Sequence, residues 1–89
     1  MGIKYKILLS KQAQKDAKKV EKAALKNKVL LLISILKRDP FFYPPFFEKL
    51  KGDLEGFYSR RINKQHRLVY EVNEEKKIVR VLRMWTHYE

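Results

Sequence analysis

The sequence predicts a small α+β domain in which a pair of helices packs on a mainly antiparallel sheet. In the first half of the chain, apolar residues recur at three- and four-residue steps, which is typical of helices. In the second half, apolar and polar residues alternate between turn signals, which is typical of strands. The 89 residues, of which 45% are hydrophobic, suffice for one core. We therefore expect a single domain over residues 1–89, with the order β-α-α-β-β-β.

The first half is expected to contain one strand and two helices. Partial alternation predicts the strand over residues 3–9, and Ser10 follows as a helix N-cap. The first helix carries a stripe of small apolar residues, at Ala13, Ala17, Val20 and Ala24, and a cationic face, at Lys11, Lys15, Lys18, Lys19 and Lys22. The second covers residues 26–37, ends at Asp39-Pro40, and buries Val29, Leu32, Ile33 and Leu36. Asn27 marks the expected break, although one longer helix also fits the pattern.

The second half is expected to be rich in strands. An aromatic segment interrupted by prolines, residues 41–47, leads into it, and its rings are expected to pack against the protein. A short strand over Glu48 to Lys51 is followed by turns at residues 52–53 and 55–56. Three further strands are predicted over residues 57–63, 67–72 and 77–85, with residues 73–76 closing a hairpin.

Alternation assigns the residues of these strands to two faces. One face of the strand over residues 57–63 carries Phe57, Ser59, Arg61 and Asn63, and the other carries Tyr58, Arg60 and Ile62. If the next strand is its neighbour, Arg61 and Arg67 share a concave polar face. Arg60 then points the other way and is expected at the surface or the edge of the core. His66 is turned away from the polar face, so a structural hydrogen bond is the favoured role for its ring.

Charge and composition limit the classes of function. The chain has 21 Lys and Arg against 10 Asp and Glu, a net charge of +11, which favours polyanionic partners. The absence of cysteine excludes disulfides and thiolate metal sites, and the scattered acids and histidines predict neither a metal site nor a cofactor. The most apolar run, residues 29–36, is far shorter than the ~20 residues that span a bilayer. Without an apolar signal region, we expect a soluble, cytoplasmic protein with no membrane partner.

His87 is the most informative candidate for catalysis. It is one of two histidines, and it follows the last predicted strand. An imidazole titrates near neutral pH and can donate a proton to a leaving group. Placed beside Arg67 and Glu48 in a very basic protein, it indicates a ribonuclease.

A longer pattern runs through the C-terminal half. It consists of Glu48-Lys49-Leu50-Lys51, the segment from Leu54 to Ile62, His66-Arg67-Leu68-Val69-Tyr70 and the ending His87-Tyr88. This pattern resembles the Txe/YoeB family of toxins from bacterial type II toxin-antitoxin modules, which have the RelE-like fold. The resemblance implies a ribosome-dependent mRNA endonuclease that cuts the codon in the ribosomal A site. It also implies inhibition by a YefM/Axe-type antitoxin and, by family analogy, a homodimer.

The resemblance also assigns roles to individual residues. Glu48 is the expected general base, His87 the general acid, and Arg67 the group that stabilises the phosphate. Such a set can cleave RNA without a metal, because the 2′-OH attacks the adjacent phosphorus. Lys51 and Arg61 are expected to contact phosphates, and Tyr88 to stack on a base or orient the substrate. Glu89 extends this chain beyond the tyrosine at which the family pattern often ends.

Other classes of function fit part of the sequence. The net charge alone equally predicts a non-catalytic RNA- or DNA-binding module. A toxin of the RelE-like fold that acts on a protein such as a DNA topoisomerase would not need Glu48, Arg67 and His87. A cationic membrane-active peptide is least favoured, because the apolar residues are expected to form a core. The lysine face of the first helix fits either a solvated surface or a contact with rRNA phosphates.

Overall fold

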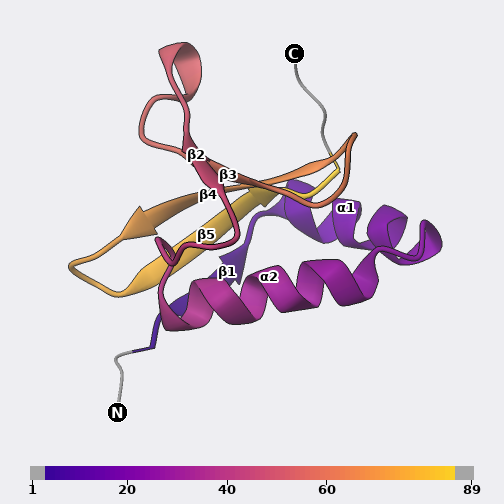
Figure 1. Ribbon diagram of the computed structural model, residues 1–89, viewed down its shortest axis with the longest axis horizontal. Helices are drawn as coiled ribbons and strands as arrows, with labels where there is room; N and C mark the ends of the chain where they lie inside the picture. The colour runs from indigo at the N-terminus through magenta and orange to yellow at the C-terminus, as the bar shows by residue number, and fades with distance from the viewer. Residues whose placement is uncertain (1–3, 86–89) are drawn as a thin grey trace.

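Two helices pack against one face of a five-stranded sheet in the computed structural model, which describes residues 4–85 (Figure 1). The helices are α1 (Lys11–Lys22) and α2 (Lys26–Arg38), and a 3₁₀ turn, η1, covers Gly52–Leu54. The strands are β1 (Lys6–Leu9), β2 (Phe47–Lys49), β3 (Tyr58–Arg61), β4 (Arg67–Asn73) and β5 (Ile78–Arg83). Their order is β1-β5-β4-β3-β2; β1 runs parallel to β5, and the other neighbours are antiparallel. The predicted α+β class and the helix pair are confirmed, and the observed order β-α-α-β-β-β-β has one strand more than the expected β-α-α-β-β-β, because the short β2 and the three strands after it all belong to the sheet.

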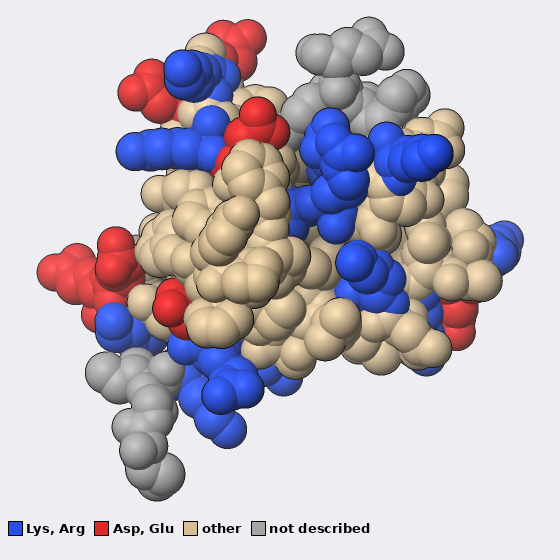
Figure 2. Space-filling view, in the orientation of Figure 1, with Lys and Arg blue, Asp and Glu red and all other residues tan. Residues whose placement is uncertain are grey.

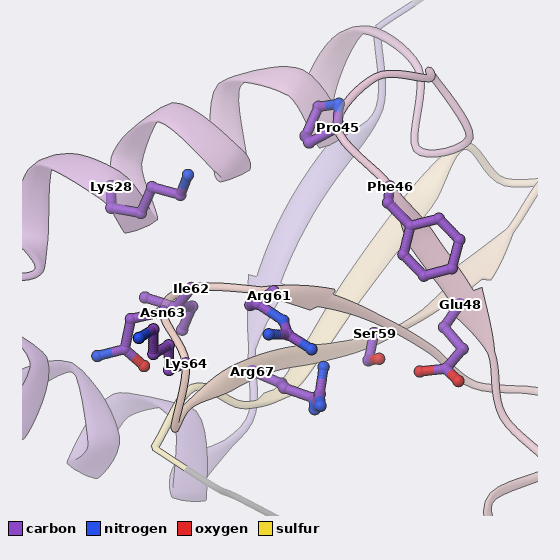
Figure 3. A pocket seen from close by; sticks show the side chains of 10 residues that line it. All are labelled: Lys28, Pro45, Phe46, Glu48, Ser59, Arg61, Ile62, Asn63, Lys64 and Arg67. Atoms are coloured by element: carbon purple, nitrogen blue, oxygen red, sulfur yellow. The ribbon is translucent and has the colours of Figure 1, made fainter.

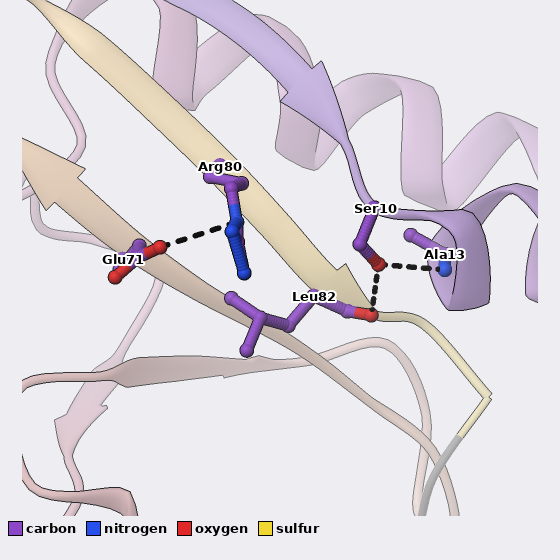
Figure 4. A network of polar contacts seen from close by, with 5 residues as sticks. All are labelled: Ser10, Ala13, Glu71, Arg80 and Leu82. Atoms are coloured by element: carbon purple, nitrogen blue, oxygen red, sulfur yellow. Dashed lines mark hydrogen bonds and ion pairs between the residues drawn. The ribbon is translucent and has the colours of Figure 1, made fainter.

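Ser10 caps α1 as expected and also ties it to the sheet. Its Oγ accepts a hydrogen bond from the backbone N–H of Ala13 (3.0 Å) and donates one to the carbonyl of Leu82 (2.7 Å), as Figure 4 shows. The first contact satisfies one of the N–H groups left open at a helix start. The second joins the start of α1 to the end of β5, 72 residues later in the chain.

The junction between the helices lies earlier than predicted. Helix α1 ends at Lys22, and Ala24 adopts a left-handed φ of 61°, so Ala24 is not part of the buried stripe. The Leu25 N–H bonds back to the Val20 carbonyl at 3.0 Å, which closes α1 without Asn27. Asn27 lies inside α2, and the prediction that it marks the break is wrong.

Within residues 4–85, neither α1 nor α2 is long and apolar enough to cross a membrane.

The strand boundaries differ from the predictions by a few residues. Strand β2 begins at Phe47, one residue earlier than predicted. It ends at Lys49, two residues earlier than predicted, because its pairing with β3 stops at Lys49 and Tyr58, after which the chain turns into η1. Strand β1 begins at Lys6. Residues 1–3 lie outside the part of the chain that the structure describes.

The core lies between the helices and the sheet. Its buried members include the predicted helix residues Ala13, Val20, Val29, Leu32 and Leu36, and from the strands Leu68, Tyr70, Val79 and Val81. The Tyr70 hydroxyl donates a hydrogen bond to the carbonyl of Pro40 at 2.9 Å. Burial raises the pKa of Tyr70 to about 12, so the phenol stays protonated and remains a donor at neutral pH.

Arg60 is buried, contrary to the expectation that it lies at the surface or the edge of the core. Its side chain is 1% exposed, and the guanidinium lies 5.0 Å from the centre of the Phe47 ring. It donates hydrogen bonds to three carbonyls, those of Pro40 (3.0 Å), Phe42 (2.9 Å) and Pro45 (2.6 Å). These bonds offset the cost of removing the charge from water. Arg60 therefore fixes the aromatic segment before β2 to the sheet.

A second buried charge holds the end of β5. Asp16 on α1 is 1% exposed, and its Oδ2 accepts hydrogen bonds from the backbone N–H groups of Met84 (3.0 Å) and Trp85 (3.2 Å). Its Oδ1 accepts from Nε2 of Gln12 at 2.9 Å. The last described residues are thus tied to α1, as Ser10 ties Leu82.

Replacing Arg60 tests its structural role. We expect Arg60→Met to lower the free energy of unfolding by about 3 kcal/mol, because three carbonyls lose a charged donor inside the protein. The matched control is Arg83→Met, since Arg83 is exposed. Urea titrations followed by circular dichroism measure both. Equal stabilities for the two variants would contradict this role.

Candidate functional site

The pairing of β2, β3 and β4 brings four polar residues onto one face of the sheet. Glu48 lies opposite Ser59 across β2 and β3, and Arg61 lies opposite Arg67 across β3 and β4. Directly paired residues project from the same face, and so do residues two apart in a strand, such as Ser59 and Arg61. The predicted sharing of one face by Arg61 and Arg67 is confirmed.

These residues line an open cleft of about 600 Å³ (Figure 3). In Figure 3, Glu48 extends from the β2 side, the two arginines extend from β3 and β4, and Ser59 lies between them. The described lining consists of Lys28, Pro45, Phe46, Glu48, Ser59, Arg61, Ile62, Asn63, Lys64 and Arg67. It contains four basic side chains and one carboxylate. Within residues 4–85, no group of three or more His, Cys, Asp or Glu could hold a metal ion.

The charge of the cleft suits an anion. Arg61 and Arg67 lie opposite each other on paired strands, so two guanidiniums share this part of the cleft. Their positive charges attract anions. Figure 2 shows several Lys and Arg side chains close together on the visible face, with others and most Asp and Glu spread around its outline. The described lining of the cleft is therefore positively charged, which favours anions such as the phosphates of a nucleic-acid backbone.

The structure brings some of the predicted site residues together and leaves others apart. Glu48, Arg61 and Arg67 line the same cleft. Lys51 is exposed just before η1 and is not part of the lining. His87 and Tyr88 lie outside the described residues.

Sequence reasoning gave Ser59 no role, although it placed the residue on the same face as Arg61. Ser59 is 2% exposed, and its Oγ has no hydrogen-bond partner within residues 4–85. A buried hydroxyl without a partner costs free energy and is uncommon in proteins. It lies beside the only carboxylate of the described lining, Glu48.

The aromatic segment behaves as expected only in part. The rings of Phe41 and Phe47 contact each other and the ring of Tyr58, with centroid distances of 5.1 to 6.2 Å. The packing expected of Phe42, Tyr43 and Phe46 is wrong, because their side chains are 53%, 66% and 65% exposed; of these three, Phe46 lines the cleft. The available signal was its position two residues before Glu48, which places both on one face of an extended chain.

His66, Met84 and Trp85 have structural roles. His66 is buried, and its ring stacks on that of Trp85, with the centroids 3.8 Å apart and the planes at 20°. Met84, which precedes Trp85, is buried as well. Because His66 precedes Arg67, this stack fixes the start of β4 next to the end of the described chain.

The fold and the cleft define a class: a small basic α+β domain with a cleft whose described lining carries four basic side chains and one carboxylate. A family model for the YoeB-like toxin of bacterial type II toxin-antitoxin systems matches residues 10–88. The chain belongs to this family. The resemblance to Txe/YoeB toxins seen in the sequence is thereby confirmed.

Individual relatives agree with this assignment. Toxin YoeB of Synechocystis is 41% identical over 65 residues, which cover 73% of each chain. The YoeB/ParE toxin structure from Agrobacterium tumefaciens has a TM-score of 0.84 and 33% identity, covering 93% of this chain and 99% of the other. The structure of the YoeB dimer from Staphylococcus aureus has a TM-score of 0.81 and 33% identity, covering 96% of this chain and 99% of the other. YoeB from the same organism in a heterotetrameric complex with YefM has a TM-score of 0.75 and 36% identity, covering 94% of this chain and 98% of the other.

The charge of the cleft can be tested by the salt dependence of RNA binding. Each phosphate contact to a single strand contributes about 0.7 to the slope of log K against log salt. We expect Arg61→Ala to reduce the slope by about that amount for a single-stranded RNA oligonucleotide, measured by fluorescence anisotropy. The control is Arg80→Ala, because Arg80 pairs with Glu71 at 3.2 Å (Figure 4) and does not line the cleft. Equal slopes for both variants would exclude the cleft as the phosphate site.

Proposed function

We propose that this toxin is a ribosome-dependent mRNA endonuclease that cuts the codon in the A site. The observation that carries the proposal is the strand register, which places Glu48, Arg61 and Arg67 around one cleft. Membership of the YoeB-like toxin family supports it. A carboxylate facing two guanidiniums suits a reaction in which a proton is removed and negative charge develops on a phosphate.

In the proposed reaction the substrate supplies its own nucleophile. Glu48 takes the proton from the 2′-OH, and the 2′-oxygen forms a bond to the adjacent phosphorus. The bond from phosphorus to the 5′-oxygen breaks, and His87 donates a proton to that oxygen. The products are a 2′,3′-cyclic phosphate and a 5′-OH. No metal takes part in this scheme, because Arg67 stabilises the charge on the phosphorane.

The remaining site residues bind the RNA. Arg61 lies opposite Arg67 and holds a neighbouring phosphate. Lys51, exposed just before η1, contacts the phosphate backbone farther along the RNA. Tyr88 stacks on a base or orients the substrate.

The proposed partners follow from the family and from the charge. YoeB of Staphylococcus aureus is found in a complex with YefM and as a dimer. We extend both features to this chain: a YefM/Axe-type antitoxin that covers the cleft, and a homodimer. The exposed lysines of α1 give the toxin a surface for rRNA phosphates of the 70S ribosome. These partners place the protein in the cytoplasm.

The experiment is primer-extension mapping of cuts in a translating mRNA, with ribosomes present or absent. The wild type should cut only A-site codons and only with ribosomes. Glu48→Ala and His87→Gln should each lower the cleavage rate by on the order of 10² to 10⁴, since each removes one proton transfer. Their affinity for the ribosome should change little.

The control variant is Glu55→Ala, which removes an exposed carboxylate from the turn after η1. It should cut like the wild type. If the wild type binds RNA but does not cut it, the chain is a binding module. If cutting persists unchanged in Glu48→Ala and His87→Gln, the assigned acid and base are wrong.

A further inference from the structure

One large aromatic side chain in the cleft has no packing role. Phe46 is 65% exposed, as Phe42 (53%) and Tyr43 (66%) of the same segment also are, but of these three only Phe46 lines the cleft. Within residues 4–85 its ring shares none of the aromatic contacts that join Phe41, Phe47 and Tyr58. Its exposure therefore does nothing for the stability of the fold.

The backbone around Phe46 is held in place, so the ring is presented from a fixed point. Arg60 bonds to the carbonyl of Pro45 at 2.6 Å, and Phe47 begins β2 opposite Arg60. Phe46 thus lies between two anchored residues. Figure 3 shows its ring beside Glu48, on the side of the cleft from which β2 enters.

The surroundings of the ring indicate the chemistry of its ligand. Phe46 shares the cleft with four basic side chains, those of Lys28, Arg61, Lys64 and Arg67. Surfaces that bind single-stranded nucleic acid combine cations, which follow the phosphates, with aromatic rings, on which the bases stack. A purely anionic ligand would satisfy the cations and leave the ring in water. A nucleotide satisfies both.

We propose that Phe46 is a base-stacking residue that positions one nucleobase of the A-site codon while the arginines hold the backbone. This inference rests on the proposed function and adds a substrate contact to it. Phe46 holds the nucleotide so that the 2′-OH of its ribose faces Glu48. The Glu48 side chain follows two residues later, on the same face of the extended chain. It takes no part in proton transfer and acts by orienting the substrate.

The test uses ribosomes programmed with mRNA and measures the second-order rate constant of single-turnover cleavage. Loss of stacking on one base should reduce this constant about 5- to 100-fold in Phe46→Leu, which keeps an apolar side chain without a ring. Phe46→Trp should retain at least the wild-type constant. Phe42→Leu is the matched control, because Phe42 is an exposed phenylalanine of the same segment that does not line the cleft. It should behave as the wild type.

Abasic substitutions distinguish stacking from a general effect on the protein. Each position of the A-site codon is replaced in turn by an abasic nucleotide. At one position, the abasic mRNA should lower the rate constant of the wild type by as much as Phe46→Leu lowers it on intact mRNA. For Phe46→Leu itself, the same abasic nucleotide should cause no further loss. Such a coupled loss identifies the base that stacks on the ring.

Three results would overturn the inference. The first is equal cleavage by the wild type, Phe46→Leu and Phe42→Leu. The second is independence of the two changes: at every codon position, the fold-loss in the rate constant caused by Phe46→Leu multiplies with the fold-loss caused by the abasic nucleotide. The ring would then act independently of any base. The third is unchanged cleavage combined with weaker binding of the antitoxin, which would make Phe46 a protein contact. Absence of cleavage by the wild type would instead contradict the proposed function, and this inference with it.

Discussion

The buried guanidinium of Arg60 is the contact on which the arrangement of the cleft depends. It gathers the carbonyls of Pro40, Phe42 and Pro45 and lies against the Phe47 ring. A charge in this position is stable only while all of these acceptors stay in place. The segment from α2 to β2 is therefore fixed to the sheet, although most of it has no regular structure. Strand β2 lies at the sheet edge as a consequence, and Glu48 faces the cleft from there.

The adjacent residues Arg60 and Arg61 point to opposite faces of the sheet: Arg60 is buried, and Arg61 lines the cleft. Because side chains alternate along a strand, fixing Arg60 on the helix side directs Arg61 to the opposite face. The pairing of β3 with β4 then sets Arg61 against Arg67, and the pairing with β2 sets Glu48 against Ser59. A one-residue slip of β3 would exchange the two faces of that strand, turning Arg61 away from the cleft and Arg60 away from its three carbonyls. The register is thus a requirement of the site as well as of the core.

The sequence predicted the elements of regular pattern and missed the contacts that alternation does not encode. The helix pair and the shared face of Arg61 and Arg67 follow from periodicity, which is local. The burial of Arg60 depends on carbonyls in a segment without periodicity, 15 to 20 residues earlier in the chain. The burial of Asp16 depends on backbone N–H groups 68 and 69 residues away. Phe46 was grouped with the packing aromatics because composition does not show which rings of such a segment reach the core.

The central claim is that the cleft positions the 2′-OH of the substrate for attack on its own phosphate. The most direct test is cleavage of ribosome-bound mRNA that carries a single 2′-deoxynucleotide at the site of the cut, with the ends of the products from unmodified mRNA identified by mass spectrometry. The account predicts no cleavage at the deoxy position and, from unmodified mRNA, a 2′,3′-cyclic phosphate with a 5′-OH. Undiminished cutting of the deoxy substrate, or products with a 3′-OH and a 5′-phosphate, would contradict it.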